Sequence, residues 1–194
     1  MQIPSMETLD LHGKKTMIRL DLNVPLKDGN VTSDARIQAA LPTIQMAIDK
    51  GAQVVLLSHL GRPDPDNLDG SFSLEPVAKK LQEILNINVS FQPNWLDGIK
   101  EESQGIVLCE NVRYEAGEKK NDESLSKQIA DLCDVYVMDA FGASHREHSS
   151  TYGALKYAKE GCIGPLLSKE VSSIRKAIDD PQAPVTAIIG GAKV

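Results

Sequence analysis

The chain has 194 residues, 41% of them hydrophobic and 25% charged, which predicts a folded globular protein of one domain, or of one domain and part of another. Its formal net charge of −6 argues against a general nucleic-acid surface, because nonspecific binding to a phosphate backbone needs a basic face. A positively charged site in this chain must therefore be a local cluster.

The sequence shows no sign of a membrane, secreted or metal-binding protein. No apolar run approaches the ~20 residues that a membrane helix needs, and the start of the chain has no apolar signal core, so we expect a cytoplasmic protein without a membrane partner. Cys109, Cys133 and Cys162 are widely spaced, which favours buried free thiols over a disulfide framework. His145 and His148 lack the cysteine or carboxylate partners of the usual metal sites, and no metal site is expected.

Apolar runs typical of β-strands alternate with helical patterns along the chain. In chain order we expect a strand at 16–22, a helix from about 33 or 34 to 50, a strand at 52–58 and a helix beginning near Ser73. Strands at 87–91 and 105–110, a helix at 122–132 and a strand at 135–142 follow. The chain continues with a loop-rich stretch to about 164, a helix at 165–180 and a last strand near 185–189. Parallel strands need crossover helices that cover both faces of the sheet. The pattern therefore predicts an α/β fold with a doubly wound parallel sheet, a Rossmann-like three-layer α/β/α arrangement.

Local signals mark several of these boundaries. Asp28 and Gly29 predict a turn after the first strand. Ser33 or Asp34 suits the N-cap of the first helix, and Gly51 is typical of a position just beyond its end. Pro165 is well placed for the first turn of the helix at 165–180.

Polar and basic side chains follow four of the expected strands. Ligands of open α/β sheets bind outside the carboxyl ends of the strands. The residues in these positions are Asp21 and Asn23 after the first strand, His59 and Arg62 after the second, Arg113 after the strand at 105–110, and Arg146 after the strand at 135–142. We therefore expect them to meet at one edge of the sheet and to line a ligand site.

Arg36 indicates an anionic ligand for this site. It falls in the first turn of a helix, where the helix dipole disfavours a cation unless an anion lies nearby. The planar guanidinium group binds phosphate or carboxylate oxygens in a bidentate manner. Asp21 and Asn23 are better suited to a hydroxyl group, so the sequence predicts a small phosphorylated hydroxy acid or sugar acid as ligand.

Other interpretations of the same residues stay open at this point. Each arginine taken alone is more often a solvated loop charge than a ligand-binding group. The same arginines could serve a non-catalytic small-anion-binding module, and Asp21 and Asp139 weakly imitate the acidic cluster of a signalling receiver domain. The sequence has neither the phosphate-binding loop of nucleotide-binding ATPases nor the glycine fingerprint of a dinucleotide site.

Five stretches carry a close resemblance to the phosphoglycerate kinase family: IRLDLNVP, SHLGRP, CENVRYEAGEKK, MDAFGASHREHSST and GGAKV. They occur in the family's order and cover essentially the whole chain. The resemblance implies that the 3-phosphoglycerate site consists of Asp21, Leu22, Asn23, Arg36, His59, Leu60, Gly61, Arg62, Arg113 and Arg146. It also implies that Arg19 lines this site. Small departures, such as Ala143 and Ser144 in place of Thr and Ala, remove no charged group.

The resemblance further implies that this is an amino-terminal fragment of a two-domain enzyme. The three parts would be a substrate-binding domain at 1–164, an interdomain helix at 165–180, and the first strand and glycine loop of a nucleotide domain at 181–194. Gly190, Gly191, Ala192 and Lys193 would contact nucleotide phosphates, and Arg36 and Lys193 would be catalytic.

For the intact enzyme, the resemblance implies reversible phosphoryl transfer in glycolysis between 1,3-bisphosphoglycerate and Mg-ADP, giving 3-phosphoglycerate and Mg-ATP. The nucleotide is a co-substrate, and no tightly bound cofactor is expected. The intact enzyme is expected to be a monomer. The chain by itself, without the carboxy-terminal nucleotide domain, is expected to bind 3-phosphoglycerate without turnover.

Overall fold

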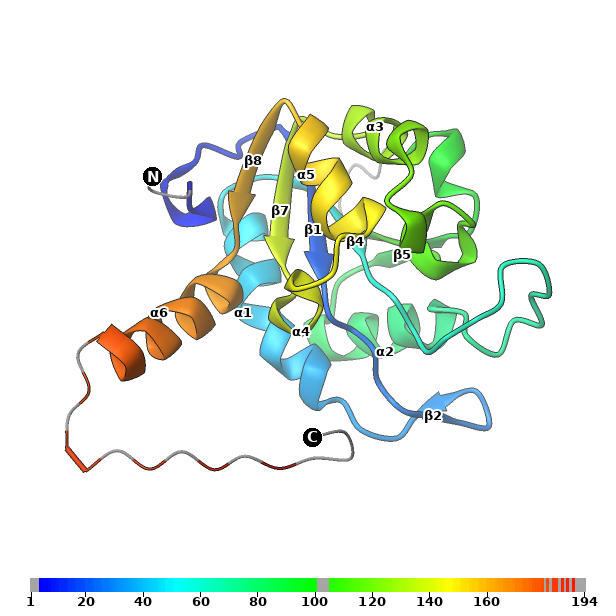
Figure 1. The fold of residues 1–194 in the computed structure, drawn as a ribbon. Helices are drawn as coiled ribbons and strands as arrows, with labels where there is room; N and C mark the ends of the chain where they lie inside the picture. Colours follow the sequence, from blue (N-terminus) through cyan, green and yellow to red (C-terminus); the bar gives the residue numbers. More distant parts are fainter. Residues whose placement is uncertain are drawn as a thin grey trace.

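The fold is built on one parallel sheet. The computed structural model describes residues 4–100 and 105–179, together with residues 181, 183, 184, 186, 188 and 190. In these residues the main sheet has six parallel strands: β1 (Lys15–Leu20), β4 (Gln53–Leu57), β5 (Val89–Gln92), β6 (Ile106–Cys109), β7 (Val135–Asp139) and β8 (Glu160–Ile163). Their order across the sheet is β5-β6-β4-β1-β7-β8, which places β1 between β4 and β7 (Figure 1).

The helices alternate with the strands as the sequence predicts. They are α1 (Ala35–Asp49), α2 (Glu75–Leu85), α3 (Glu123–Asp131), α4 (Phe141–Ser144), α5 (Ala154–Tyr157) and α6 (Pro165–Asp179). Shorter helical turns lie between them: η1 (Met6–Thr8), η2 (Trp95–Asp97), η3 (Val112–Tyr114), η4 (Glu118–Lys120) and the π-helical η5 (Ser149–Gly153).

The ends of the helices follow local chemistry. The Asp122 carboxylate accepts the Leu125 amide at 2.9 Å and so caps α3. Leu74, rather than Ser73, occupies the N-cap position of α2, although the Ser73 hydroxyl still accepts the Glu75 amide at 3.2 Å. The expected turn at Asp28 and Gly29 has φ angles of 51° and 73° and joins the short antiparallel strands β2 (Leu26–Lys27) and β3 (Asn30–Val31).

Helices pack on both faces of the sheet. Adjacent residues of β1 point to opposite faces, so that Ile18 packs with α1 and α2, whereas Met17 packs with α3 and Trp95. Both faces are covered in Figure 1, with α1 and α2 on one side and α3 and α5 on the other. The predicted α/β fold with a doubly wound parallel sheet is confirmed.

The stretch between β7 and α6 is more regular than the sequence suggests. The expected loop is wrong, because this stretch contains α4, η5, α5 and the edge strand β8. The strand gave no apolar signal because it reads EGCI, with Cys162 as its one buried residue. Its last residue is tied to the amino-terminal segment, since the Ile163 amide donates to the Pro4 carbonyl at 3.0 Å.

The structure confirms the expectation for the cysteines, whereas the expectation for the end of the chain stays a prediction. Cys109, Cys133 and Cys162 are buried free thiols, as expected, and burial raises the pKa of each thiol. In the described part of the chain, no helix is both long and apolar enough to cross a bilayer. The strand expected near 185–189 lies largely outside the described residues.

Asp139 joins α6 to the rest of the fold. This fully buried residue ends β7, and its carboxylate accepts hydrogen bonds from the Leu167 amide at 2.8 Å and the Thr43 hydroxyl at 2.5 Å. Gly164 leaves room for it, because a Cβ there would lie 2.3 Å from the Asp139 carboxyl carbon. One side chain therefore connects β7, α1 and the first turn of α6, from which the helix projects away from the sheet (Figure 1).

Removing this carboxylate should destabilise the fold. Asp139→Ala leaves a buried amide and a buried hydroxyl without their partner, and each such loss costs ~1–3 kcal/mol. We expect the free energy of unfolding in urea to fall by about 2–4 kcal/mol. The matched control is Asp131→Ala, at an exposed position of α3. A difference below about 0.5 kcal/mol between the two variants would show that the junction contributes nothing.

Candidate functional site

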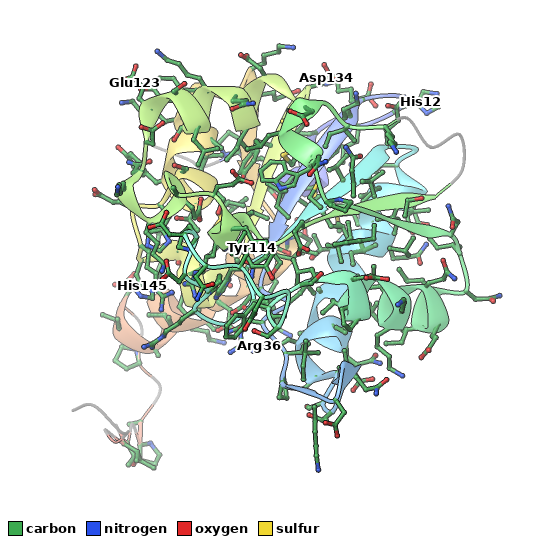
Figure 2. The ribbon with its side chains drawn as sticks, turned by 90° about the vertical axis from the view of Figure 1, so that its right-hand side faces the viewer. His12, Arg36, Tyr114, Glu123, Asp134 and His145 are labelled. Atoms are coloured by element: carbon green, nitrogen blue, oxygen red, sulfur yellow. The ribbon has the colours of Figure 1, made fainter. Side chains whose placement is uncertain are left out.

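The strand order brings the carboxyl ends of β1, β4, β6 and β7 to one edge of the sheet. These four strands are neighbours, and all run in the same direction. Figure 2 shows Arg36 and His145 at this edge, whereas His12 and Asp134, which precede β1 and β7, lie at the opposite end of the molecule. The predicted gathering of strand-end residues therefore follows from the topology.

A cluster of basic side chains surrounds a cavity of about 260 Å³ at this edge, here called the basic cavity. It is lined by Arg62, Arg113, Lys119, Arg146 and His148. Three of the predicted arginines thus meet, although they come from the loops after three different strands. None of these described lining residues is a carboxylate, and the buried Glu118 is the acidic group whose charge reaches Arg113 and His148 from behind. An anion in the cavity would relieve the repulsion among the basic side chains.

The pKa of Arg113 reflects its burial and the crowding of positive charges around it. Burial lowers the pKa of its guanidinium group, and the charges of Arg146 and Arg19 lower it further. Its side chain is held in place, because it donates to the Gly61 carbonyl at 2.5 Å. The group is therefore fixed beside other cations before any ligand arrives.

The loops after β1 and β4 are joined by hydrogen bonds. The Leu22 amide donates to the Ser58 hydroxyl at 2.8 Å, and the Gly61 amide donates to the Asn23 side-chain oxygen at 2.9 Å. Gly61 has a φ of 59°, and a Cβ there would lie 2.1 Å from the Phe72 ring, so only glycine fits. The predicted residues Leu22, Asn23 and Gly61 thus belong to two loops that hydrogen bonds hold together, and they do not line the basic cavity.

Asn111 holds two loops of the site together and was missed by the sequence analysis. It is fully buried, and its side-chain oxygen accepts the amides of Leu60 and Arg113 at 3.2 and 3.1 Å. Its side-chain amide donates to the carbonyls of Leu60 and Phe72 at 2.7 and 2.9 Å. The available signal was a polar residue directly after the buried strand β6. Asn111 holds the His59 loop against the Arg113 turn.

Arg36 lies outside the basic cavity. Its guanidinium group forms an ion pair with the Asp21 carboxylate, and about half of its side chain is exposed. The other Asp21 oxygen accepts the Asn23 amide at 3.2 Å. Arg36 is still close enough for its charge to lower the pKa of His59. These residues therefore flank the basic cavity rather than line it.

The two site histidines are held neutral. Burial lowers the pKa of His59 from 6.5 to about 2, with further contributions from Arg19 and other arginines. Burial also lowers the pKa of His148 from 6.5 to about 4, and Arg113 is the strongest of the charges that add to this effect. At neutral pH the positive charge of the site therefore comes from arginine and lysine.

This neutrality should make the fold sensitive to acid. The folded pKa of His59 lies below the unfolded value, so the unfolded chain takes up the proton first and stability falls as the pH drops below about 6.5. One such ring contributes up to ~1.4 kcal/mol per pH unit. We expect His59→Asn to lose less stability than the unaltered chain between about pH 6.5 and about pH 4.5, measured by urea unfolding. Burial raises the pKa of Asp139 and Glu118, which acts in the opposite direction, so the difference between the two proteins is the quantity to measure. Equal pH slopes would contradict a neutral, buried His59.

Lys119 and His148 were also not predicted as ligand-binding residues. Lys119 lies on η4 within the GEKK stretch, and His148 was considered only as a metal ligand. In the described ranges, no group of three or more His, Cys, Asp or Glu side chains is placed to hold a metal ion.

The predicted glycine loop at the end of the chain lies mostly outside the described residues. Gly190 is described and exposed, whereas Gly191, Ala192 and Lys193 are not among the described residues.

A second cavity lies at the opposite edge of the sheet. It has a volume of about 600 Å³ and is lined in part by His12, Gly51, Gln53 and Gly105. No arginine or lysine lines it. It is larger than the basic cavity but lacks the converging charges that would recognise a small anion.

Comparison with known proteins identifies the family to which the chain belongs. The family model described as phosphoglycerate kinase matches residues 6–194. The phosphoglycerate kinases of Francisella tularensis subsp. novicida and Nitratidesulfovibrio vulgaris are each 52% identical to the chain over 194 residues. The match covers all of this chain and 50% and 49% of these relatives. The chain therefore spans about half the length of the curated relatives that it matches.

Solved structures agree with the sequence comparison. The phosphoglycerate kinase of Coxiella burnetii superposes with a TM-score of 0.89 at 49% identity, covering 94% of this chain and 47% of that protein. The enzyme of Pyrococcus horikoshii superposes with a TM-score of 0.80 at 31% identity, covering 93% of this chain and 47% of that protein.

Proposed function

The chain belongs to the phosphoglycerate kinase family, and we propose that it is the part that binds 3-phosphoglycerate, with the basic cavity as the anion site. The observation that carries this proposal is the meeting of Arg62, Arg113 and Arg146 around one small cavity without a carboxylate. A ligand with two anionic ends suits such a cluster, because each guanidinium group can bind two oxygens of one phosphate or carboxylate group.

The expected affinity is moderate. Charge-assisted hydrogen bonds contribute about 1.5–3 kcal/mol each, whereas association costs roughly 4–15 kcal/mol. Several such bonds can offset this cost and leave a Kd in the micromolar to millimolar range. Lys119, which lines the same cavity, adds a mobile point charge.

The flanking residues suit the uncharged part of the ligand. Asp21 and Asn23 would bind the hydroxyl group. The Asn23 side-chain oxygen already accepts the Gly61 amide, so the side-chain nitrogen of Asn23 would be the group that contacts the ligand. Leu22, Leu60 and Gly61 would contribute backbone contacts beside it. Arg36, now paired with Asp21, would turn toward the phosphoryl group during transfer.

For the whole protein we propose reversible phosphoryl transfer from 1,3-bisphosphoglycerate to Mg-ADP in cytoplasmic glycolysis, by a monomeric enzyme. Such transfer asks little covalent chemistry of a protein, and positioning and cationic stabilisation supply most of the catalysis. Arg36 and Lys193 would stabilise the moving phosphoryl group, and Gly190, Gly191 and Ala192 would adjoin the nucleotide phosphates. Residues 1–164 would form the substrate domain, 165–180 the interdomain helix and 181–194 the start of the nucleotide domain.

Calorimetric titration of the chain with 3-phosphoglycerate tests this proposal. We expect saturable binding, with glycerate and sulfate binding more weakly because each offers only one anionic group. Absence of binding at tens of millimolar ligand in low salt would overturn it. If sulfate bound as tightly as 3-phosphoglycerate, the chain would be a general small-anion-binding module instead.

A further inference from the structure

A buried carboxylate lies beneath the basic cavity. Glu118 precedes Lys119 on η4, and only 1% of its surface is exposed. Its two oxygens accept hydrogen bonds from the Ser150 amide at 2.9 Å and from the Ser150 hydroxyl at 2.6 Å. His148 is also close, with Nδ1 at 3.8 Å from Oε1 of Glu118. The Ser150 hydroxyl thus uses its one donor in the hydrogen bond to Glu118, so its oxygen can only accept from other groups.

Arg19 is the counterpart of this carboxylate. The family resemblance predicted that it lines the site, but it is 1% exposed and lies inside the protein. Its Nε donates to the Ser150 hydroxyl at 2.9 Å, and one terminal nitrogen donates to the Leu20 carbonyl. Burial lowers the pKa of Arg19, whereas the charge of Glu118 raises it. Glu118 and Ser150 therefore neutralise and orient a buried guanidinium group.

The remaining terminal nitrogen of Arg19 contacts the ring of His59. It lies 3.2 Å from His59 Nδ1. A guanidinium group has donors only, so Nδ1 must accept this bond and cannot carry a proton. A neutral imidazole then has its proton on Nε2. In the described structure Nε2 has no hydrogen-bond partner and is not among the fully buried atoms that lack one, so it keeps some accessible surface although His59 as a whole is only 5% exposed.

We propose that Arg19, oriented by Ser150 and Glu118, is a positioning residue that fixes His59 as the neutral tautomer with its proton on Nε2, and so makes this ring a hydrogen-bond donor to an anionic ligand. The opposite tautomer would present a lone pair and repel an anion. The identity of the ligand rests on the proposed function, but the state of the ring is a property of the ligand-free chain.

The charges around the ring favour the same state. Arg19 comes from β1, Arg36 from α1, Arg113 from η3 and Arg146 from the loop after α4. All four are cations that oppose protonation of His59. These charges therefore keep the ring neutral near neutral pH, whereas the contact with Arg19 decides which of its nitrogens carries the proton.

Long-range ¹H–¹⁵N correlation spectra of the chain labelled at histidine test the proposal without any ligand. The His59 signals are assigned by their loss in His59→Asn. We expect the Nε2–H tautomer from about pH 8 to about pH 5, and a mixture of tautomers in Arg19→Met. Ser150→Ala, a milder change in case Arg19→Met does not fold, should shift the same signals in the same direction. Arg175→Met, at an exposed position on α6, is the matched control and should leave them unchanged.

Three results would overturn the proposal: a proton on Nδ1 in the unaltered chain, protonation of the ring near pH 6, or a tautomer unchanged by loss of Arg19. A binding measurement tests the donor role. Ser150→Ala should weaken 3-phosphoglycerate binding several-fold, and this effect should vanish when His59 is already Asn. If the unaltered chain does not bind 3-phosphoglycerate, both the proposed function and the donor role of His59 fail. The positioning role of Arg19 is still tested in that case, because the spectra report the tautomer of His59 without any ligand.

Discussion

Replacing both Arg62 and Arg146 with alanine is expected to abolish measurable binding of 3-phosphoglycerate. Each residue contributes charge-assisted hydrogen bonds worth about 1.5–3 kcal/mol, so each single change should weaken binding by about 10- to 150-fold. The double change should weaken it by about 100- to 20,000-fold if the two effects add. Both side chains line the basic cavity, and neither has a carboxylate partner there. Calorimetric titration in low salt measures the effect.

The control for this experiment is Arg175→Ala, which removes the same charge from an exposed position of α6 outside the cavity. It should leave the affinity unchanged. Thermal unfolding of each variant checks that the fold is intact. An affinity in Arg62→Ala or Arg146→Ala within about twofold of the unaltered chain would remove these residues from the site.

The chain alone is expected to form no ATP from 1,3-bisphosphoglycerate and ADP, even though it binds 3-phosphoglycerate. It spans about half the length of its relatives, and the family resemblance places most nucleotide contacts in the other half. Phosphoryl transfer depends on positioning both substrates in line and on excluding water by closure. A substrate-binding domain by itself can neither position the nucleotide nor close over the reacting groups.

A coupled assay for ATP formation decides this second expectation. A full-length relative, such as the phosphoglycerate kinase of Coxiella burnetii, serves as the positive control. Turnover by the purified chain above the rate without protein would contradict the division of labour between two domains. Activity that appears only after addition of a separate carboxy-terminal half would support it.

The parts of the site set by topology could be predicted from the sequence. Apolar runs separated by helical patterns predicted parallel strands, and parallel strands place their carboxyl ends at one edge. Arg62, Arg113 and Arg146 follow three of these strands and meet around the basic cavity. The prediction succeeded because it depended on the position of each residue along a strand and not on the direction of its side chain.

The parts set by side-chain direction could not be predicted. Arg19 lies within a strand, where period-two alternation gives the face but not the buried partners Glu118 and Ser150, which are about a hundred residues or more away in the sequence. Arg36 was expected in the anion cluster, but the nearby Asp21 carboxylate competes for it in the absence of ligand. The edge strand β8 was missed because an edge strand buries little and needs no apolar run.

A crystal structure of the chain with 3-phosphoglycerate tests the anion site most directly. We expect the phosphate or the carboxylate group of the ligand within hydrogen-bond distance of the guanidinium groups of Arg62, Arg113 and Arg146, with the hydroxyl group toward Asp21 and Asn23. A fully occupied ligand in the cavity lined by His12, or one held without contact to any of these arginines, would contradict the proposed site.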